Sequence, residues 1–167
     1  MPELTLHCLR VTAGPHGGEL SRWPELLDHY LAYRIAQAEQ CGRTYHPVRP
    51  HPEDFDGVCG TYIVAEHAGE GIGCVGVRFL DEHTTELKNM WVEPRARRWG
   101  VATGLVTAAE DWARDHGATR MRLDTHETLR DAVRLYERSG YQRIPAYNTN
   151  PNASLWFEKQ LGASPTR

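Results

Sequence analysis

The stretch from Val92 to Thr103 reads VEPRARRWGVAT and joins a strand pattern to a helix pattern. Pro94 ends the strand because it has no N–H for a sheet ladder. Gly100 lets a ligand approach the backbone, and the first helical turn that follows has free N–H groups for an anion. Arg97 and Arg98 add donors that suit phosphate. The stretch predicts a pyrophosphate cradle; the alternative is a solvated basic loop that caps a core helix.

Three runs before this stretch are rich in β-branched and aromatic residues or alternate in polarity, as strands do. They are residues 60–66, 73–80 and 84–92. Residues 69–71 predict a hairpin turn between the first two runs. In the third run, strict alternation of side chains places Glu86 on one face with Met90 and Val92. A predicted sheet therefore leads directly into the basic stretch.

The rest of the chain changes between helix and strand patterns. Helical spacing of apolar residues marks 26–40, 101–117 and 129–139, and strands are predicted at 4–11, 119–124 and 154–161. Residues 14–18 have turn composition, and three prolines make residues 46–56 a loop with at most one short helical turn. We therefore predict one α/β (α+β) domain over residues 1–167, on a mostly antiparallel sheet, with a frayed tail at 162–167.

The composition excludes several classes of protein. The chain has 167 residues, of which 40% are hydrophobic and 25% charged, as is typical of a single globular domain. The net charge of -3 argues against binding through bulk electrostatics, so we expect no nucleic acid as partner. No segment approaches the ~20 apolar residues of a membrane span, so we expect no membrane either.

The cysteines and histidines predict neither disulfides nor a metal site. Cys8, Cys41, Cys59 and Cys74 are widely spaced and form no CxxC pair, and the nine histidines are scattered. The N-terminus does not resemble a signal peptide. We therefore expect free thiols, no metal and a cytoplasmic location.

Residues 97–102 match the R/Q-x-x-G-x-G/A motif of the GNAT superfamily of N-acetyltransferases. As in that family, the motif follows a strand ending in Val-x-Pro and precedes a long helix. The resemblance covers residues 57–161 well. It implies the GNAT fold: a mixed, mostly antiparallel sheet of about seven strands, splayed between the fourth and fifth and flanked by about four helices. It also implies acetyl-CoA or coenzyme A as the cofactor.

The resemblance assigns the cofactor contacts as well. In the family, the loop binds the pyrophosphate, and the preceding strand pairs with the pantetheine arm. Carried over, these contacts are Met90, Trp91, Val92, Arg97, Arg98, Trp99, Gly100, Val101, Ala102 and Thr103. A strand amide, that of Val92, would polarise the thioester carbonyl.

Residues 129–141 resemble a second family signature, N-x-x-A-x-x-x-Y-x-x-x-G-F/Y. Tyr136 stands where the family has the tyrosine that protonates the leaving thiolate. A phenol with a pKa of about 10 suits that role. Leu129 stands where many members have asparagine, which removes one side-chain contact. The alternative for Tyr136 is a tyrosine at the edge of the core.

An amine must lose a proton before its nitrogen attacks a thioester. Glu86 precedes Arg97 by eleven residues, a spacing that matches the catalytic glutamate of GNAT histone acetyltransferases, and we predict it as the base. Three alternatives stay open. The first is that Glu86 is only a strand glutamate paired with Lys88. The second is that His126 is the base, and the third is that a chain of water molecules takes the proton.

The C-terminal run resembles a subgroup of small bacterial GNAT proteins that carry a Y-x-x-N-P element before a last strand. Tyr147 to Pro151 form this element here, and they would lie near the acceptor mouth. The alternative is an ordinary turn, because asparagine and proline are common turn residues.

The resemblance implies an acyltransferase that moves an acetyl group from acetyl-CoA to a primary amine by direct attack in a ternary complex. A small-molecule amine is the expected acceptor, and homodimers are common among relatives. Two alternatives remain: a protein acetyltransferase acting on an N-terminus or a lysine, and a non-catalytic sensor of acyl-CoA.

Overall fold

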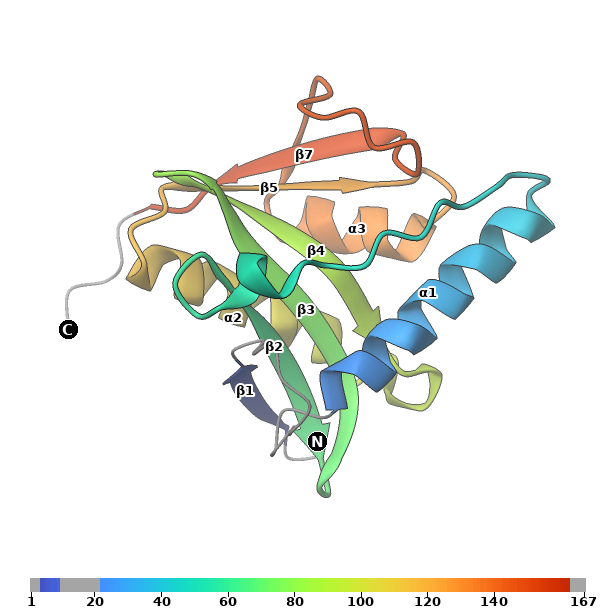
Figure 1. The fold of residues 1–167 in the computed structure, drawn as a ribbon, viewed down its shortest axis with the longest axis horizontal. Coiled ribbons are helices and arrows are strands. Elements are labelled where there is room, and N and C mark those ends of the chain that lie inside the picture. Colours follow the sequence, from blue (N-terminus) through green and yellow to red (C-terminus); the bar gives the residue numbers. More distant parts are fainter. Residues whose placement is uncertain (1–3, 10–21, 163–167) are drawn as a thin grey trace.

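The computed structural model describes residues 4–9 and 22–162, and its centre is a seven-stranded sheet (Figure 1). The strands are β1 (Thr5–Leu9), β2 (Gly60–His67), β3 (Glu70–Asp81), β4 (Thr84–Val92), β5 (Arg120–Thr125), β6 (Gln142–Ile144) and β7 (Leu155–Gln160). Their order is β1-β2-β3-β4-β5-β7-β6, and only the β4–β5 pair is parallel. The predicted mostly antiparallel sheet is therefore confirmed.

Three α-helices lie in the described part of the chain, where about four were predicted. They are α1 (Arg22–Gln40), α2 (Val101–Asp115) and α3 (Arg130–Arg138), with short 3-10 turns at Pro52–Phe55 and Pro94–Ala96. α1 begins four residues before the predicted start, and Pro24 fits its first turn because N–H groups there have no helical acceptor. No described helix is long and apolar enough to cross a membrane. The turn predicted at residues 14–18 lies outside the described residues.

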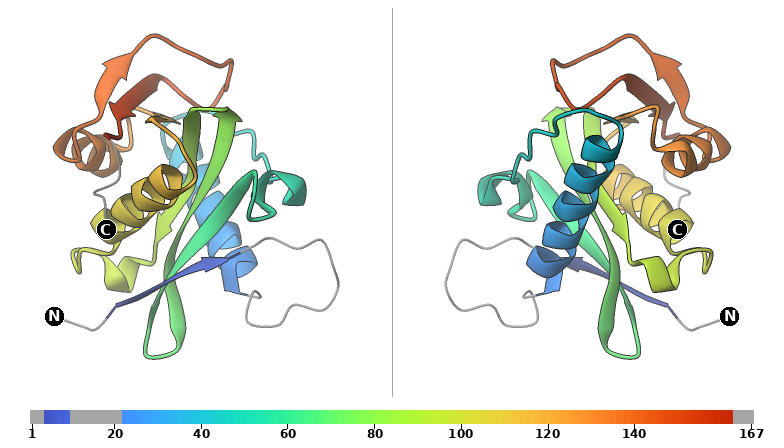
Figure 2. Two further views of the ribbon diagram at one scale, coloured as in Figure 1. Left: turned by 90° about the vertical axis from the view of Figure 1, so that its left-hand side faces the viewer. Right: turned by 90° about the vertical axis from the view of Figure 1, so that its right-hand side faces the viewer.

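The helices lie on both faces of the sheet (Figure 2). α2 and α3 pack on one face over the main core, where Leu105, Leu123 and Phe157 are fully buried. α1 covers part of the other face, where Leu26 packs against Trp91. Burial of these apolar side chains, at about 25 cal/mol per Å², fixes the helices to the sheet.

The sheet opens beside β4. The β4–β5 pairing runs only from Thr84 opposite Arg120 to Glu86 opposite Arg122, and the two strands then diverge, as Figure 1 shows. This confirms the predicted splay between the fourth and fifth strands. The C-terminal half of β4 consequently has one edge without a neighbouring strand.

A β-bulge interrupts the alternation of side chains in β4. Asn89 has a left-handed backbone with φ of 53°, and the register with β3 shifts beside it. Beyond the bulge, Met90 and Val92 contact the core under α2, whereas Trp91 packs on the α1 face. The prediction that Glu86 shares a face with Met90 and Val92 was wrong, because the bulge adds one residue to the strand.

Candidate functional site

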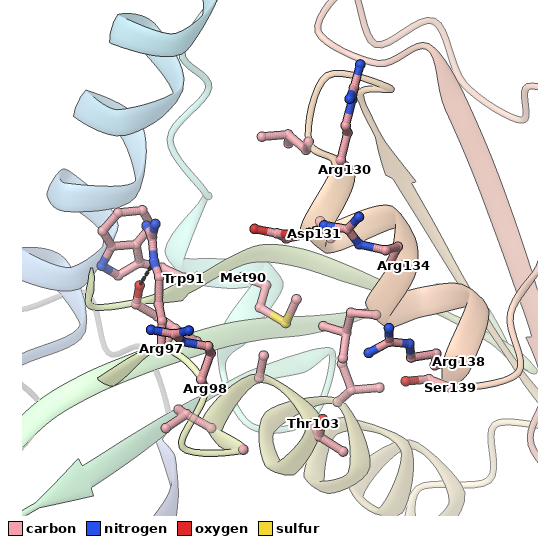
Figure 3. A pocket seen from close by; sticks show the side chains of 18 of the residues that line it. Met90, Trp91, Arg97, Arg98, Thr103, Arg130, Asp131, Arg134, Arg138 and Ser139 are labelled. Carbon is pink, nitrogen blue, oxygen red and sulfur yellow. Dashed lines mark hydrogen bonds and ion pairs between the residues drawn. The ribbon is translucent and has the colours of Figure 1, made fainter. Parts of the chain in front are cut away.

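The divergence of β4 and β5 leads into a cleft of about 920 Å³ between α1, the start of α2 and α3 (Figure 3). Nine of the ten predicted cofactor residues line it. These nine are Met90, Trp91, Val92, Arg97, Arg98, Gly100, Val101, Ala102 and Thr103. Trp99 does not line it; its ring lies edge-on to that of His67, with 5.5 Å between the ring centroids.

The N-terminus of α2 faces this cleft with its first turn uncapped. Gly100 is the N-cap residue, in a left-handed conformation with φ of 83°, and it provides no side-chain hydrogen bond to the helix. A β-carbon placed on Gly100 would meet no atom within 4 Å, so the approach to the helix is open. Free N–H groups at a helix N-terminus favour an anion.

The free edge of β4 lies along the same cleft. The N–H of Glu93 donates to the carbonyl of Ile72 on the β3 side at 2.8 Å. Because successive N–H groups of a strand point to opposite edges, that of Val92 points toward the edge from which β5 has diverged. Arg97 Nε lies 3.5 Å from the carbonyl oxygen of Val92. A ligand in the cleft can therefore pair with the backbone of β4.

A second cleft, of about 400 Å³, adjoins the first. Tyr30, Arg34, Met90, Leu129 and Ala132 line both. The second cleft also reaches Glu86 on β4 and Asp124 on β5. The two clefts are therefore continuous along the splayed strands.

Glu86 is 1% exposed and has three partners. Arg78 Nε lies 3.0 Å from Oε2, and Lys88 Nζ lies 3.5 Å from Oε1. The hydroxyl of Tyr147 donates to Oε1 at 2.8 Å. The buried carboxylate is thus compensated by two cations and a phenol.

Tyr136 lies where α3 meets the second cleft. It is 5% exposed, and its ring packs near those of Tyr141 and Phe157. Burial raises the pKa of Tyr136 above the ordinary phenol value, because the charged phenolate is poorly solvated there. The hydroxyl is therefore protonated at neutral pH and also a weaker acid than a free phenol.

Two loops border the second cleft, and polar side chains fix them. Asn148 and Asn150 each donate a side-chain N–H to a different oxygen of Asp124, at 2.7 and 3.0 Å. Asn152 makes two hydrogen bonds to the main chain of His46 in the proline-rich loop. The loop at Tyr147 to Pro151 is therefore part of a hydrogen-bonded wall beside the cleft.

Residues 23–141 match the model of the acetyltransferase (GNAT) family. The chain belongs to this family. It is 36% identical over 95 residues to an uncharacterised N-acetyltransferase of Schizosaccharomyces pombe. The matched stretch covers 55% of this chain and 58% of that one. The chain spans about half the length of the first curated relatives it matches.

Solved structures have the same GNAT fold. An acetyltransferase from Staphylococcus aureus Mu50 superposes with a TM-score of 0.74 at 15% identity, over 95% of this chain and 99% of that one. A GNAT acetyltransferase from Elizabethkingia anophelis, solved with acetyl-CoA bound, superposes with a TM-score of 0.57 at 18% identity, over 94% of this chain and 97% of that one.

The GNAT cleft contains cations that the sequence patterns did not single out. Arg130, Arg134 and Arg138 of α3 all line the cleft. Arg134, which pairs with Asp131, and Arg138 extend toward the side where Arg97 and Arg98 lie, whereas Arg130 points away from them, as Figure 3 shows. The four-residue spacing of the α3 arginines puts them on one side of the helix. That spacing was the available signal, but it is also typical of an ordinary solvated helix face.

His126 does not line either cleft of this GNAT protein. Its Nδ1 accepts the backbone N–H of Thr128 at 3.2 Å, so the neutral ring carries its proton on Nε2. Burial, followed by the charge of Arg43, lowers the pKa of His126. This geometry disfavours His126 as the base.

Proposed function

We propose that this GNAT protein transfers the acetyl group of acetyl-CoA to a primary amine by direct attack in a ternary complex. The observation that carries the proposal is the meeting of the free β4 edge with the uncapped α2 N-terminus in one cationic cleft. That cleft continues into a second cleft beside Tyr136. Two clefts that share Met90 suit two substrates whose reacting atoms must meet.

The residues present fit acetyl-CoA. The open approach at Gly100, with Arg97 and Arg98 beside it, suits a pyrophosphate. The free β4 edge suits the amide groups of a pantetheine arm. The α3 arginines add positive charge for the remaining phosphate of the coenzyme. When bound, acetyl-CoA supplies the activated acetyl group.

Val92, Tyr136 and Glu86 have distinct roles in the proposal. The amide of Val92 stabilises the negative charge that develops on the thioester oxygen. The hydroxyl of Tyr136 gives its proton to the departing sulfur as the C–S bond breaks, and water returns a proton to the phenolate before the next turnover. Glu86 is a positioning residue that orients Arg78 and Lys88, because protonation of its carboxylate would weaken the ion pairs that it already makes with them. The proton of the amine passes to water in the second cleft.

Cysteine chemistry does not favour an acyl-enzyme. Cys74 is fully buried, and burial raises the pKa of its thiol to about 12. Cys41 and Cys59 are exposed and line neither cleft. Direct transfer therefore agrees better with the described thiols.

A small acceptor fits the second cleft better than a protein segment. The two loops beside it are joined by the side chain of Asn152, and the Tyr147–Pro151 element is held to Asp124. A protein acceptor needs a longer open groove for its chain. A non-catalytic sensor has no need of a protonated Tyr136 at the junction of two clefts.

A thiol-release assay with a panel of small amines tests the proposal. We expect the wild type to release coenzyme A in an amine-dependent way, with the acetylated amine found by mass spectrometry. Amine-independent release only, or none from folded protein, would contradict catalysis. Binding of acetyl-CoA without transfer to any amine would favour the sensor.

A further inference from the structure

Arg34 lies at the junction of the two clefts without an acidic partner. It extends from α1 on the same side as Tyr30, and its Nη1 donates to the Tyr30 hydroxyl at 3.3 Å. Its guanidinium carbon lies 4.9 Å from the ring centroid of Tyr45 and 5.9 Å from that of Tyr30. No carboxylate of the described residues forms an ion pair with it, although it is partly buried.

The acids of the second cleft, by contrast, are all compensated. Asp54 pairs with Arg78 at 2.8 Å, and Arg78 also pairs with Glu86. Lys88 Nζ lies 3.5 Å from Glu86 and 3.6 Å from Asp124. A cationic acceptor would therefore have to compete with existing partners for each acid.

The exposed arginine of this cleft, Arg49, is already neutralised as well. Arg49 pairs with Asp28 on α1, at 2.5 Å. Arg34 is thus the unpaired charge of the second cleft within the described residues. The Arg34 guanidinium is planar, contacts two aromatic rings and is hydrogen-bonded to one of them, and its forked N–H donors suit a carboxylate.

We propose that the acceptor is a small amino carboxylate, and that Arg34 binds its carboxylate while the amine points toward Met90 and Tyr136. The inference rests on the acetyltransferase function proposed above. Arg34 lies close enough to Tyr136 for its charge to oppose, in part, the larger effect of burial, which raises the pKa of Tyr136. A volume of about 400 Å³ suits a molecule the size of one amino acid.

The coenzyme is the rival occupant, since Arg34 also lines the first cleft. Five other arginines, on the α2 approach and on α3, already surround that cleft: Arg97, Arg98, Arg130, Arg134 and Arg138. Arg34 differs from them in its contacts with Tyr30 and Tyr45, which both line the second cleft. These contacts favour the acceptor.

The test compares each of the twenty amino acids with its carboxamide in the thiol-release assay. The amide keeps the shape, loses the charge and has a less basic amine, so chemistry alone favours the amide. We expect at least one amino acid to exceed its amide in kcat/KM by about 10- to 100-fold, the range of a charged hydrogen bond. Arg34→Gln should reduce this preference to about threefold or less, mainly through KM.

Three controls accompany the assay. Arg34→Lys keeps the charge without the fork and should retain part of the preference. Arg143→Gln removes an exposed arginine of β6 that pairs with Glu137, and it should change neither the kcat nor the KM for the amino acid. Circular dichroism reports whether each variant is folded, and titration with acetyl-CoA tests the rival occupant: Arg34→Gln should leave the Kd for acetyl-CoA within about threefold of the wild type.

The inference is overturned if amino acid amides are acetylated as well as the acids are. It is also overturned if the protein binds acetyl-CoA but acetylates no amine that carries a carboxylate. A loss of acetyl-CoA affinity in Arg34→Gln with the acid preference intact overturns it as well. Failure of the proposed function is recognisably different. The wild type then gives no heat with acetyl-CoA and releases no thiol with any amine, which would remove both claims.

Discussion

The side-chain amide of Asn152 pairs with both main-chain groups of His46, which lies 106 positions earlier in the sequence. Asn152 Oδ1 accepts the N–H of His46 at 2.8 Å, and its Nδ2 donates to the carbonyl of His46 at 2.7 Å. Asn152 is 7% exposed, so water does not readily replace these bonds. One side chain thus joins the two loops that border the second cleft.

Asn152→Ala should loosen this wall. Losing both hydrogen bonds should lower the free energy of unfolding by about 2 kcal/mol and raise the acceptor KM, with little change in acetyl-CoA affinity. Chemical denaturation and steady-state kinetics measure the two effects. Gln142→Ala, at an exposed site on β6, serves as the control. An unchanged KM would show that the loop contact does not shape the acceptor site.

Tyr136→Phe should lower kcat by about 10²-fold and leave acetyl-CoA affinity unchanged, because it removes only the proton donor. Tyr141→Phe alters a neighbouring ring that lines neither cleft, and it should keep the wild-type kcat. Equal rates for Tyr136→Phe and wild type would exclude the proposed role.

The pH profile of the wild type provides a separate check on Tyr136. Burial raises its pKa above the ordinary value of about 10, so the donating, protonated form persists at higher pH than for a free phenol. We therefore expect no decline in kcat between about pH 8 and 10 from loss of this proton. A decline there that Tyr136→Phe abolishes would contradict the raised pKa, because Tyr136 would then lose its proton within this range.

Glu86→Gln separates a positioning role from a base. Losing the buried charge between Arg78 and Lys88 should destabilise the fold by about 3 kcal/mol. It should lower kcat by the same factor at every pH. The effects of Glu86→Gln and Tyr147→Phe on kcat should be non-additive, because the two side chains share a hydrogen bond. If the variant instead loses the acidic limb of the pH profile, Glu86 is the base.

The pairing of His29 with Glu93 predicts a pH-dependent attachment of α1 to the end of β4. His29 Nδ1 lies 2.5 Å from Glu93 Oε1, and this hydrogen bond raises the pKa of His29. A raised pKa means that the stabilisation is complete below the unfolded value of about 6.5 and is lost as pH rises through the folded value.

The thermal unfolding midpoint should therefore fall modestly from about pH 6 to 8. His29→Gln should flatten this part of the curve. The effect should be small because the His29 side chain is 47% exposed. A midpoint that rises over this range in the wild type but not in the variant would refute the pairing.

Much of the fold could be predicted because its signals are local. Apolar spacing gave all three described α-helices within a few residues, and Pro94 and Gly100 marked the change from strand to helix. The face of Met90 could not be predicted, because strict alternation contains no signal for the bulge at Asn89. The bulge depends on the register with β3, which is a tertiary property.

The candidate site divides in the same way. The cradle is one continuous stretch, so its residues could be named from the sequence. The acceptor side is assembled from segments far apart in the chain, such as Arg34 on α1, Glu86 on β4 and Asn152 near β7. Only the folded chain shows that Glu86 is compensated while Arg34 is not.

The most direct test of the central claim is a calorimetric titration with acetyl-CoA. We compare the wild type with Arg98→Glu/Gly100→Trp, which places a negative charge and a large ring at the open approach to α2. The proposed function predicts micromolar binding by the wild type, abolished in this variant and retained in Arg143→Gln. No binding by folded wild type, or equal binding by the double variant, would contradict it.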